Sequence, residues 1–258
     1  GNTIINNTTP AVGAENDPTT MGDDLTESVL VTGCLDTDGD GDCDFTDTDI
    51  NDPCNFTAGS IPDTTNPTWQ AADCDGDGED NGTETTNGTD PTDPCENQMT
   101  VIPPNPMTGP SPEQTAYDIW AAEDCDGDGV TNGVEGETDG TDPYDLCDYN
   151  VASQVLANVS SSWNDADCDG DGVTNGDEIA SGTNPQDPCD YNPILITLAP
   201  TTAWLLADCD GDGVINGQEV VDGTDPLDPC DYIDGNQTVA VAAAWEALDC
   251  DGDGVTNG

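Results

Sequence analysis

Aspartates recur along the chain with a spacing that can bind a divalent cation. Counted from its first Asp, each complete copy of the motif has acids at positions 1, 3 and 5, Gly at 6, Asn at 9 and Glu at 12. A 12-residue loop with this pattern directs carboxylate and carbonyl oxygens to one point, and its Gly permits a sharp turn. Oxygen ligands without His disfavour zinc and copper, and Mg²⁺ prefers fewer protein ligands. The pattern therefore predicts calcium, one or two ions per repeat, in loops that begin at Asp36, Asp73, Asp124, Asp167, Asp208 and Asp249.

The predicted ligands form two sets. The loop set holds the residues at positions 1, 3, 5, 9 and 12: Asp36, Asp38, Asp40, Asp73, Asp75, Asp77, Asn81, Glu84, Asp124, Asp126, Asp128, Asn132, Glu135, Asp167, Asp169, Asp171, Asn175, Glu178, Asp208, Asp210, Asp212, Asn216, Glu219, Asp249, Asp251, Asp253 and Asn257. The second set follows each loop, mostly in Asp-Pro-x-Asp-Pro segments: Asp44, Asp47, Asp90, Asp93, Asp142, Asp145, Asp187, Asp225 and Asp228. Its carboxylates either complete a cation site or are solvated in turns. Solvated turns are also the alternative for the loop set, but turns do not require three alternating acids.

The charge of the chain supports bound cations. Its 258 residues include 56 acids and no Lys, Arg or His, which gives a formal net charge of −56. A compact state would repel itself strongly unless cations supply positive charge. Nucleic acid and anionic membranes need Lys/Arg patches and are excluded as partners. Because no His or Lys base and no Arg clamp exists, we expect no enzyme; a glycosidase with two carboxylates is the alternative, but no such pair is identifiable.

The loops are parts of a repeat, because their first residues lie 37 to 51 positions apart. Such a period is typical of arrays in which each unit mainly contacts its neighbours. We therefore predict a repeat protein with little regular secondary structure: an elongated, calcium-stabilised and disulfide-stapled rod with short strands and single helical turns. Its expected parts are a lead-in (1–31), a variant repeat (32–68), four repeats (69–119, 120–162, 163–203, 204–244) and a truncated repeat (245–258).

The inserts between the loops carry the apolar residues. Every Trp of the chain lies four residues before a loop, at Trp69, Trp120, Trp163, Trp204 and Trp245. We interpret these side chains as anchors of small cores, with ligand stacking as the alternative. A helical turn is expected around each Trp, a short strand early in each insert, and a further helical turn after each loop, where Asn and Glu have capping-box spacing and a Gly follows.

The chain has 12 cysteines, which indicates a disulfide framework and an oxidising compartment. Thiolate metal binding is the competing interpretation, but no second Cys or His lies at CxxC spacing. Pairing within each motif, such as Cys74 with Cys95, leaves two cysteines over. Pairing across each insert leaves none and is favoured by parity: Cys34–Cys43, Cys54–Cys74, Cys95–Cys125, Cys147–Cys168, Cys189–Cys209 and Cys230–Cys250.

The motif Asp-x-Asp-Gly-Asp-Gly-x-x-Asn-Gly-x-Glu-x-x-x-Gly-Thr-Asp-Pro resembles the thrombospondin type 3 repeat, especially its bacterial form in secreted and cell-surface proteins. The resemblance covers the motif half of all six units, about half of the chain. It implies calcium-dependent folding, an extended shape and a structural or adhesive role. Two features depart from the family: the inserts separate loops that it often packs in tandem, and Thr37 replaces the loop Cys.

These observations lead to one preferred function and one alternative. The sequence stops at Gly258, before the Glu that its last loop needs, so flanking repeats of a longer chain or another copy, head to tail, are the expected partners. We expect an extracellular or cell-surface structural protein in a filament, stalk or adhesin. The alternative is a dockerin-like calcium-dependent protein-binding module. The longest apolar stretch is too short to enter a membrane as a span, and no secretory leader is recognised.

Glycans are further expected partners, because sequons for N-glycosylation recur along the chain. Bare surface Asn and Thr residues are the alternative. The candidate positions are Asn6, Asn7, Asn55, Asn87, Asn158 and Asn236.

Overall fold

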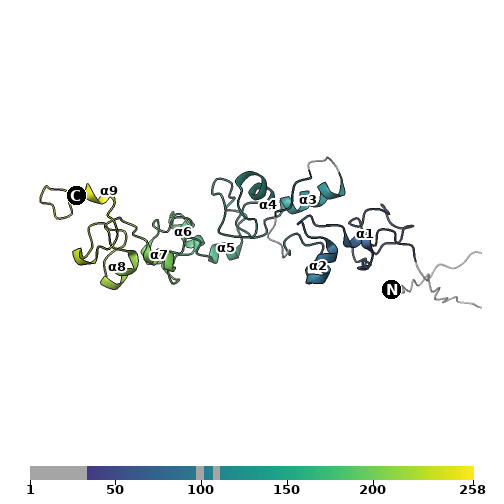
Figure 1. Cartoon of the computed structure of the whole chain (residues 1–258), viewed down its shortest axis with the longest axis horizontal. Helices are drawn as coiled ribbons and strands as arrows, with labels where there is room; N and C mark the ends of the chain where they lie inside the picture. The colour runs from purple at the N-terminus through teal and green to yellow at the C-terminus, as the bar shows by residue number, and fades with distance from the viewer. Residues whose placement is uncertain (1–33, 97–101, 107–110) are drawn as a thin grey trace, which may run out of the picture. The chain divides into compact units, whose positions relative to one another are not determined.

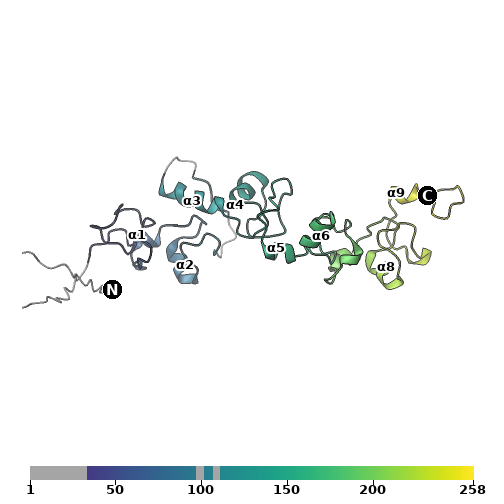
Figure 2. The ribbon, with the colours of Figure 1, turned by 180° about the vertical axis from the view of Figure 1, so that it is seen from behind.

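The structure is a computed structural model that describes residues 34–96, 102–106 and 111–258 (Figure 1). The predicted lead-in and two candidate glycosylation positions, Asn6 and Asn7, lie outside the described residues. The contacts divide the chain into two compact units, Gly1–Trp120 and Ala121–Gly258. Figures 1 and 2 show, from opposite sides, short helices joined by loops in both units. The structure is a repeat fold with little regular secondary structure, as predicted.

The first unit contains helices α1 (Pro67–Gln70) and α2 (Asn81–Asn87), and helix α3 (Pro112–Ala122) begins in it. α1 begins with a Pro, and the Asn66 side chain caps it by accepting a hydrogen bond from the Thr68 N–H. α2 is capped in the same way by Asp80 and ends at Gly88, whose φ of 84° is in the left-handed region that favours glycine. Local capping therefore decides where these short helices begin and end.

The second unit alternates two kinds of helix. One kind surrounds each Trp: α5 (Ser161–Asp165), α7 (Thr202–Leu206) and α9 (Ala243–Glu246). The other follows each loop: α4 (Asn132–Val134) with the π-helical turn η1 (Glu135–Asp139), then α6 (Asn175–Ser181) and α8 (Asn216–Asp222). Two 3₁₀ turns, η2 (Pro193–Leu195) and η3 (Asp234–Asn236), lie in the inserts. Both predicted kinds of helical turn are confirmed.

The prediction of short strands is wrong for the described residues, none of which lies in a strand. In the insert after the fourth loop, the N–H groups of Thr197 and Thr201 donate to the carbonyls of Gly172 and Gly170, at 2.9 and 2.8 Å. The insert thus forms its hydrogen bonds with single carbonyl groups of a tight turn. A β-ladder needs a second extended segment, which this arrangement does not supply.

Small apolar clusters replace a single large core. In one cluster Val173, Tyr191 and Trp204 are buried together, and the Tyr and Trp rings meet edge to face with their centroids 5.8 Å apart. Val130, Tyr149 and Trp163 form the equivalent cluster one repeat earlier. These Trp residues are core anchors, as predicted. Each cluster combines a loop residue with residues of the following insert, so the clusters join loop to insert.

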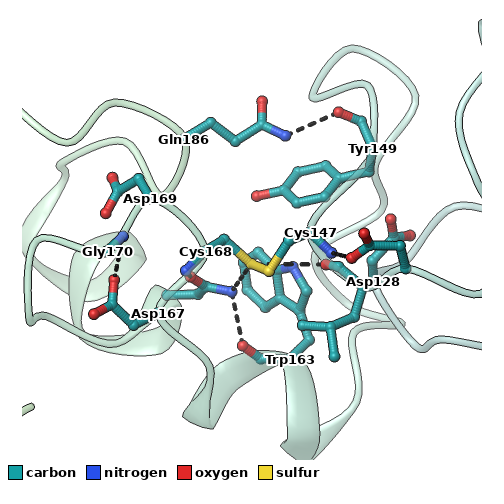
Figure 3. Close-up of a disulfide and its surroundings, with 12 residues drawn as sticks. Asp128, Cys147, Tyr149, Trp163, Asp167, Cys168, Asp169, Gly170 and Gln186 are labelled. Atoms are coloured by element: carbon teal, nitrogen blue, oxygen red, sulfur yellow. Dashed lines mark hydrogen bonds between the residues drawn. A yellow bond between two sulfur atoms is a disulfide. The ribbon is translucent and has the colours of Figure 1, made fainter. Parts of the chain in front are cut away.

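Disulfides close the inserts. The structure contains Cys34–Cys43, Cys54–Cys74, Cys147–Cys168, Cys189–Cys209 and Cys230–Cys250, with Cα atoms 5.1 to 5.5 Å apart. Cys95 and Cys125 are also disulfide-bonded, and no cysteine is free. This pattern is pairing across the inserts, the scheme that parity favours. Figure 3 shows Cys147–Cys168 beside Trp163, so the disulfide and the Trp anchor stabilise the same part of the repeat.

Candidate metal centres

The fourth loop shows how the backbone arranges the carboxylates. The two oxygens of Asp167 accept hydrogen bonds from the N–H groups of Gly170 and Gly172, at 2.8 and 3.0 Å; the first of these is drawn in Figure 3. Asp169 accepts from the Asp171 N–H at 3.2 Å. Gly170 and Gly172 have φ values of 83° and 97°, which side-chain-bearing residues rarely adopt. The turn therefore converges on the three aspartates, and one oxygen from each lies within 4.8 Å of the others.

The same arrangement recurs along the chain. Three aspartates gather equally closely in the loops Asp36–Asp38–Asp40, Asp73–Asp75–Asp77, Asp124–Asp126–Asp128 and Asp208–Asp210–Asp212. In the last loop the N–H groups of Gly252 and Gly254 donate to Asp249, at 2.8 and 2.9 Å, as in the fourth loop. The structure thus brings together the acids that were predicted at positions 1, 3 and 5.

The Glu at position 12 completes the buried acidic cluster. Glu178, in the first turn of α6, is fully buried, and neither of its carboxylate oxygens has a hydrogen-bond partner. One carboxylate oxygen of Asp169 and one of Asp171 are also buried without a hydrogen-bond partner. Glu84 and Glu219 repeat this pattern, whereas one oxygen of Glu135 accepts from Thr141 at 3.2 Å. An ionised carboxylate is costly to bury without a partner.

The pKa values of these acids are raised for the same reason. Burial, reinforced by the charges of Asp169 and Asp171, raises the pKa of Glu178 from 4.5 to about 8. Burial and the neighbouring Asp171 raise the pKa of Asp169 to about 7. The pKa is likewise raised to about 8 at Glu84, Glu135 and Glu219. Because the chain has no Lys, Arg or His, only an external cation can compensate these charges, and their oxygen ligands suit a hard divalent ion.

The asparagines at position 9, which are predicted ligands, each link their loop to neighbouring segments, and their role as ligands stays a prediction. The amide oxygen of Asn175 accepts from the Cys168 N–H at 3.1 Å, and its amide nitrogen donates to the Trp163 carbonyl at 2.9 Å and lies 3.1 Å from the Cys168 sulfur. The amide therefore links the loop to the Trp helix and the disulfide. In the other loops the amide oxygen of the equivalent asparagine also accepts from the N–H of the loop Cys, at 3.0 to 3.3 Å: Asn81, Asn132, Asn216 and Asn257.

The second set of acids lies mainly in turns. A carboxylate oxygen accepts from the backbone N–H two residues later, at 3.1 Å, in Asp90, Asp93, Asp142, Asp145, Asp187, Asp225 and Asp228. The charge of Asp225 nevertheless contributes to the raised pKa of Glu219. In the first repeat, Asp44 accepts from both the N–H and the hydroxyl of Thr37, and Asp47 contributes to the raised pKa values of Asp38 and Asp40. The role of this second set of acids as cation ligands stays a prediction.

The acid after the second Cys of each motif was missed among the candidate ligands. The charge of Asp148 contributes to the raised pKa of Asp128, and that of Asp190 to the raised pKa of Glu178. The repeated tripeptide Cys-Asp-Tyr was the available signal, and its Tyr supplies the aromatic partner of the next Trp.

The described sequons differ in how the Asn side chain is engaged. The amide nitrogen of Asn87 donates to Glu79 at 2.6 Å, and that of Asn236 donates to Asp222 at 2.5 Å. Asn55, Asn87 and Asn158 are exposed, and Asn236 is half-buried. Exposed amides are the more accessible to a glycosylating enzyme.

The fold and these sites define a class of protein: a disulfide-stapled array of acidic cation-binding loops. The family model of the bacterial TSP3 repeat matches residues 124–145, 167–188 and 208–229, so the chain carries repeats of the thrombospondin type 3 family. No curated protein and no solved structure matches the chain.

The family match and the structure bear on function and location. TSP3 repeats are calcium-binding and structural, not catalytic, and the aspartate clusters of this chain can hold a metal ion. Together with the disulfides, these repeats indicate an extracellular protein. None of the helices among the described residues has the length and apolar character needed to cross a membrane.

Proposed function

We propose that each complete loop binds calcium, with one or two ions per repeat, and that the ions make folding of the repeats possible. The observation that carries the proposal is the set of buried carboxylate oxygens without partners, such as those of Glu178, in a chain without a cationic side chain. In the fourth loop the ion would be held by Asp167, Asp169, Asp171 and Glu178. The bound ion supplies positive charge, which couples binding to folding.

Removal of calcium tests this proposal. Above about pH 8, where buried acids such as Glu178 are ionised, excess chelator is expected to abolish the far-UV circular dichroism signal of the short helices and to shift tryptophan fluorescence towards that of exposed indole. Added calcium should restore both signals, and equimolar magnesium should restore them poorly because it rarely accepts so many protein ligands. Spectra that stay unchanged in chelator would refute the proposal.

We further propose that the protein is an extracellular structural element of a filament, stalk or adhesin. The support is a contact that repeats along the chain, in which a backbone N–H of each insert donates to the carbonyl at position 4 of the preceding loop. The pairs are Ser160 with Gly127, Thr201 with Gly170 and Ala242 with Gly211. The equivalent face of the last loop is exposed, with Val255 69% accessible against 0% for Val214. The proposed partner in the same type of contact is a flanking repeat or another copy of the chain, head to tail. The proposed glycan positions among the described residues are Asn55, Asn87, Asn158 and Asn236, of which the first three are exposed.

Assembly can be tested with the full chain by analytical ultracentrifugation and electron microscopy at millimolar calcium. A Val255→Asp variant is the matched control, because it changes the exposed face and leaves the buried valines intact. Calcium-dependent polymers that are lost in the variant support assembly through this face. Monomers of the full chain at every calcium concentration count against self-assembly and favour flanking repeats as the partners.

A further inference from the structure

An Asn-Gly pair recurs at positions 9 and 10 of the second to fifth loops. The asparagine is fully buried in each of them: Asn81, Asn132, Asn175 and Asn216. Each is also the first residue of the helix that follows its loop. There the amide bonds to both the loop and the Trp helix, as Asn175 does with the Cys168 N–H and the Trp163 carbonyl. The fold therefore uses both ends of the amide group at position 9.

The glycine at position 10 is needed because the backbone of the Trp helix lies so close. A Cβ atom added to Gly176 would lie 3.0 Å from the carbonyl oxygen of Asn164, and one added to Gly217 would lie 2.7 Å from that of Leu205. A Cβ atom on the other two glycines would also meet a carbonyl oxygen of the Trp helix, at 3.1 and 2.9 Å: Gly82 and Gly133. The contact between the two helices therefore leaves no room for a side chain, and the Asn-Gly pair follows from packing.

Asn-Gly is also the pair in which an asparagine side chain reacts most readily with the backbone, because glycine has no side chain to hinder its nitrogen. That nitrogen forms a bond to the Cγ atom of the asparagine, and the side-chain nitrogen leaves as ammonia, taking the proton of the glycine N–H. Water then opens the cyclic imide to give aspartate or isoaspartate. The reaction needs a mobile backbone and a free amide, whereas the folded loop holds the asparagine in a helix with its amide hydrogen-bonded and buried.

We propose that the asparagines at position 9 are sites of spontaneous deamidation, which the folded calcium-bound repeat protects and the calcium-free chain exposes. The inference rests on the proposed coupling of calcium binding to folding and adds a covalent consequence of calcium loss. An aspartate in place of Asn175 cannot donate to the Trp163 carbonyl. An isoaspartate adds one carbon atom to the backbone between Asp171 and Glu178. Both products should hinder refolding when calcium returns, so prolonged calcium loss becomes irreversible.

Peptide mapping with tandem mass spectrometry measures the deamidation of each asparagine in the full chain. Samples are incubated above about pH 8, where the buried acids are ionised, with calcium, with chelator, or with calcium in strong denaturant. The denatured sample gives the rate of the unprotected pair. With calcium we expect rates at least about tenfold below the denatured rate, because only locally open molecules react. In chelator the rates should approach the denatured rate, and the circular dichroism signal recovered with calcium should fall as deamidation proceeds.

Asp167→Ala is the matched variant, because it weakens one loop and leaves the Asn-Gly pair in place. It removes the carboxylate that accepts from the N–H groups of Gly170 and Gly172. In calcium the variant should deamidate faster at Asn175, while the rate at Asn81, which lies in the other compact unit, should stay unchanged. An unchanged rate at Asn175 would mean that the order of the loop does not protect the asparagine.

The remaining outcomes separate this inference from the proposed calcium function. Equal rates with calcium and in denaturant, or slow deamidation in a chain that chelator has unfolded, would overturn the inference and leave calcium-dependent folding intact. A chain that keeps its circular dichroism signal in chelator and deamidates there as slowly as with calcium would remove the calcium function, and with it calcium control of these sites. Full recovery of the fold after complete deamidation would overturn the irreversible consequence.

Discussion

The second and fourth loops share one acidic frame and differ in what lies beside it. In both, the first Asp accepts from the N–H groups at positions 4 and 6: Asp73 from Gly76 at 2.7 Å and Asp167 from Gly170 at 2.8 Å. Beside this frame the fourth loop buries Val173 against aromatic rings, whereas the second buries Glu79. The difference shows that the cation-binding frame does not depend on an apolar residue at position 7. The loops should therefore differ in how strongly they need calcium.

The largest expected effect is that of pH on the calcium-free chain, because several carboxylates per loop titrate together. The pKa of Glu178 is raised from 4.5 to about 8 in the fold. Below about pH 4.5 this group is protonated in both states and adds no penalty; as pH rises to about 8 it ionises in the unfolded chain first, so stability of the calcium-free fold falls. Calcium affinity should rise over the same range, because the ligands must be deprotonated.

Thermal unfolding followed by circular dichroism in chelator, from pH 5 to pH 9, checks this prediction. The variant Glu84→Gln with Glu178→Gln is the control, and it should flatten the dependence in both loops relative to the unmodified chain. A calcium-free fold that is more stable at pH 9 than at pH 5 would contradict the pKa shifts.

The next effect comes from making the fourth loop like the second. Val173→Glu places a carboxylate in the cluster with Tyr191 and Trp204, without an amide partner placed like Asn87. In saturating calcium, where the repeat is folded, we expect a loss of about 3–5 kcal/mol in local stability, as is usual for an uncompensated buried charge. Hydrogen exchange of residues 167–206 measures the loss. Val173→Ala is the control for lost packing, and an equal effect of the two variants would show that charge at this position is unimportant.

The disulfides should affect the two loops equally. Cys54–Cys74 and Cys189–Cys209 both join residues 20 positions apart. Replacing either pair with serines should cost about 3 kcal/mol, mainly through the entropy of the unfolded chain. Local stability from hydrogen exchange in saturating calcium checks this value. A much larger loss in one loop would mean that the disulfides contribute to the difference in calcium dependence.

The smallest expected effect tests the asparagine clamp. Asn175→Asp replaces the donor that bonds the Trp163 carbonyl with a second acceptor, so we expect a loss of about 2 kcal/mol. Asn81→Asp should behave alike, because Asn81 donates to the Trp69 carbonyl at 3.0 Å. Calcium titrations decide between the two roles of the asparagine. If it is a ligand, the Asp variant should bind calcium more tightly than the unmodified chain. If it only holds the loop in place, the Asp variant should bind calcium more weakly.

Much of this molecule could be predicted from sequence because the repeat displays it several times. The acids at positions 1, 3, 5 and 12, the Trp anchors and the cross-insert disulfides follow from spacing and parity. The hydrogen bond from Asn175 to the Trp163 carbonyl could not be predicted, because the two residues lie 12 positions apart in the sequence. The strands were overpredicted because β-branched residues suggest extended backbone but do not show whether a second strand is present. The burial of Glu79 was not predicted, because a carboxylate at a position outside the ligand pattern is expected to face solvent.

The central claim is that cations compensate the buried acids, and metal content tests it most directly. The full chain is dialysed against buffer with micromolar free calcium, and protein-bound calcium is measured by plasma mass spectrometry against the dialysate. The account predicts at least one bound ion for each complete loop, those that begin at Asp73, Asp124, Asp167 and Asp208. A folded chain with no calcium above the dialysate level would contradict it.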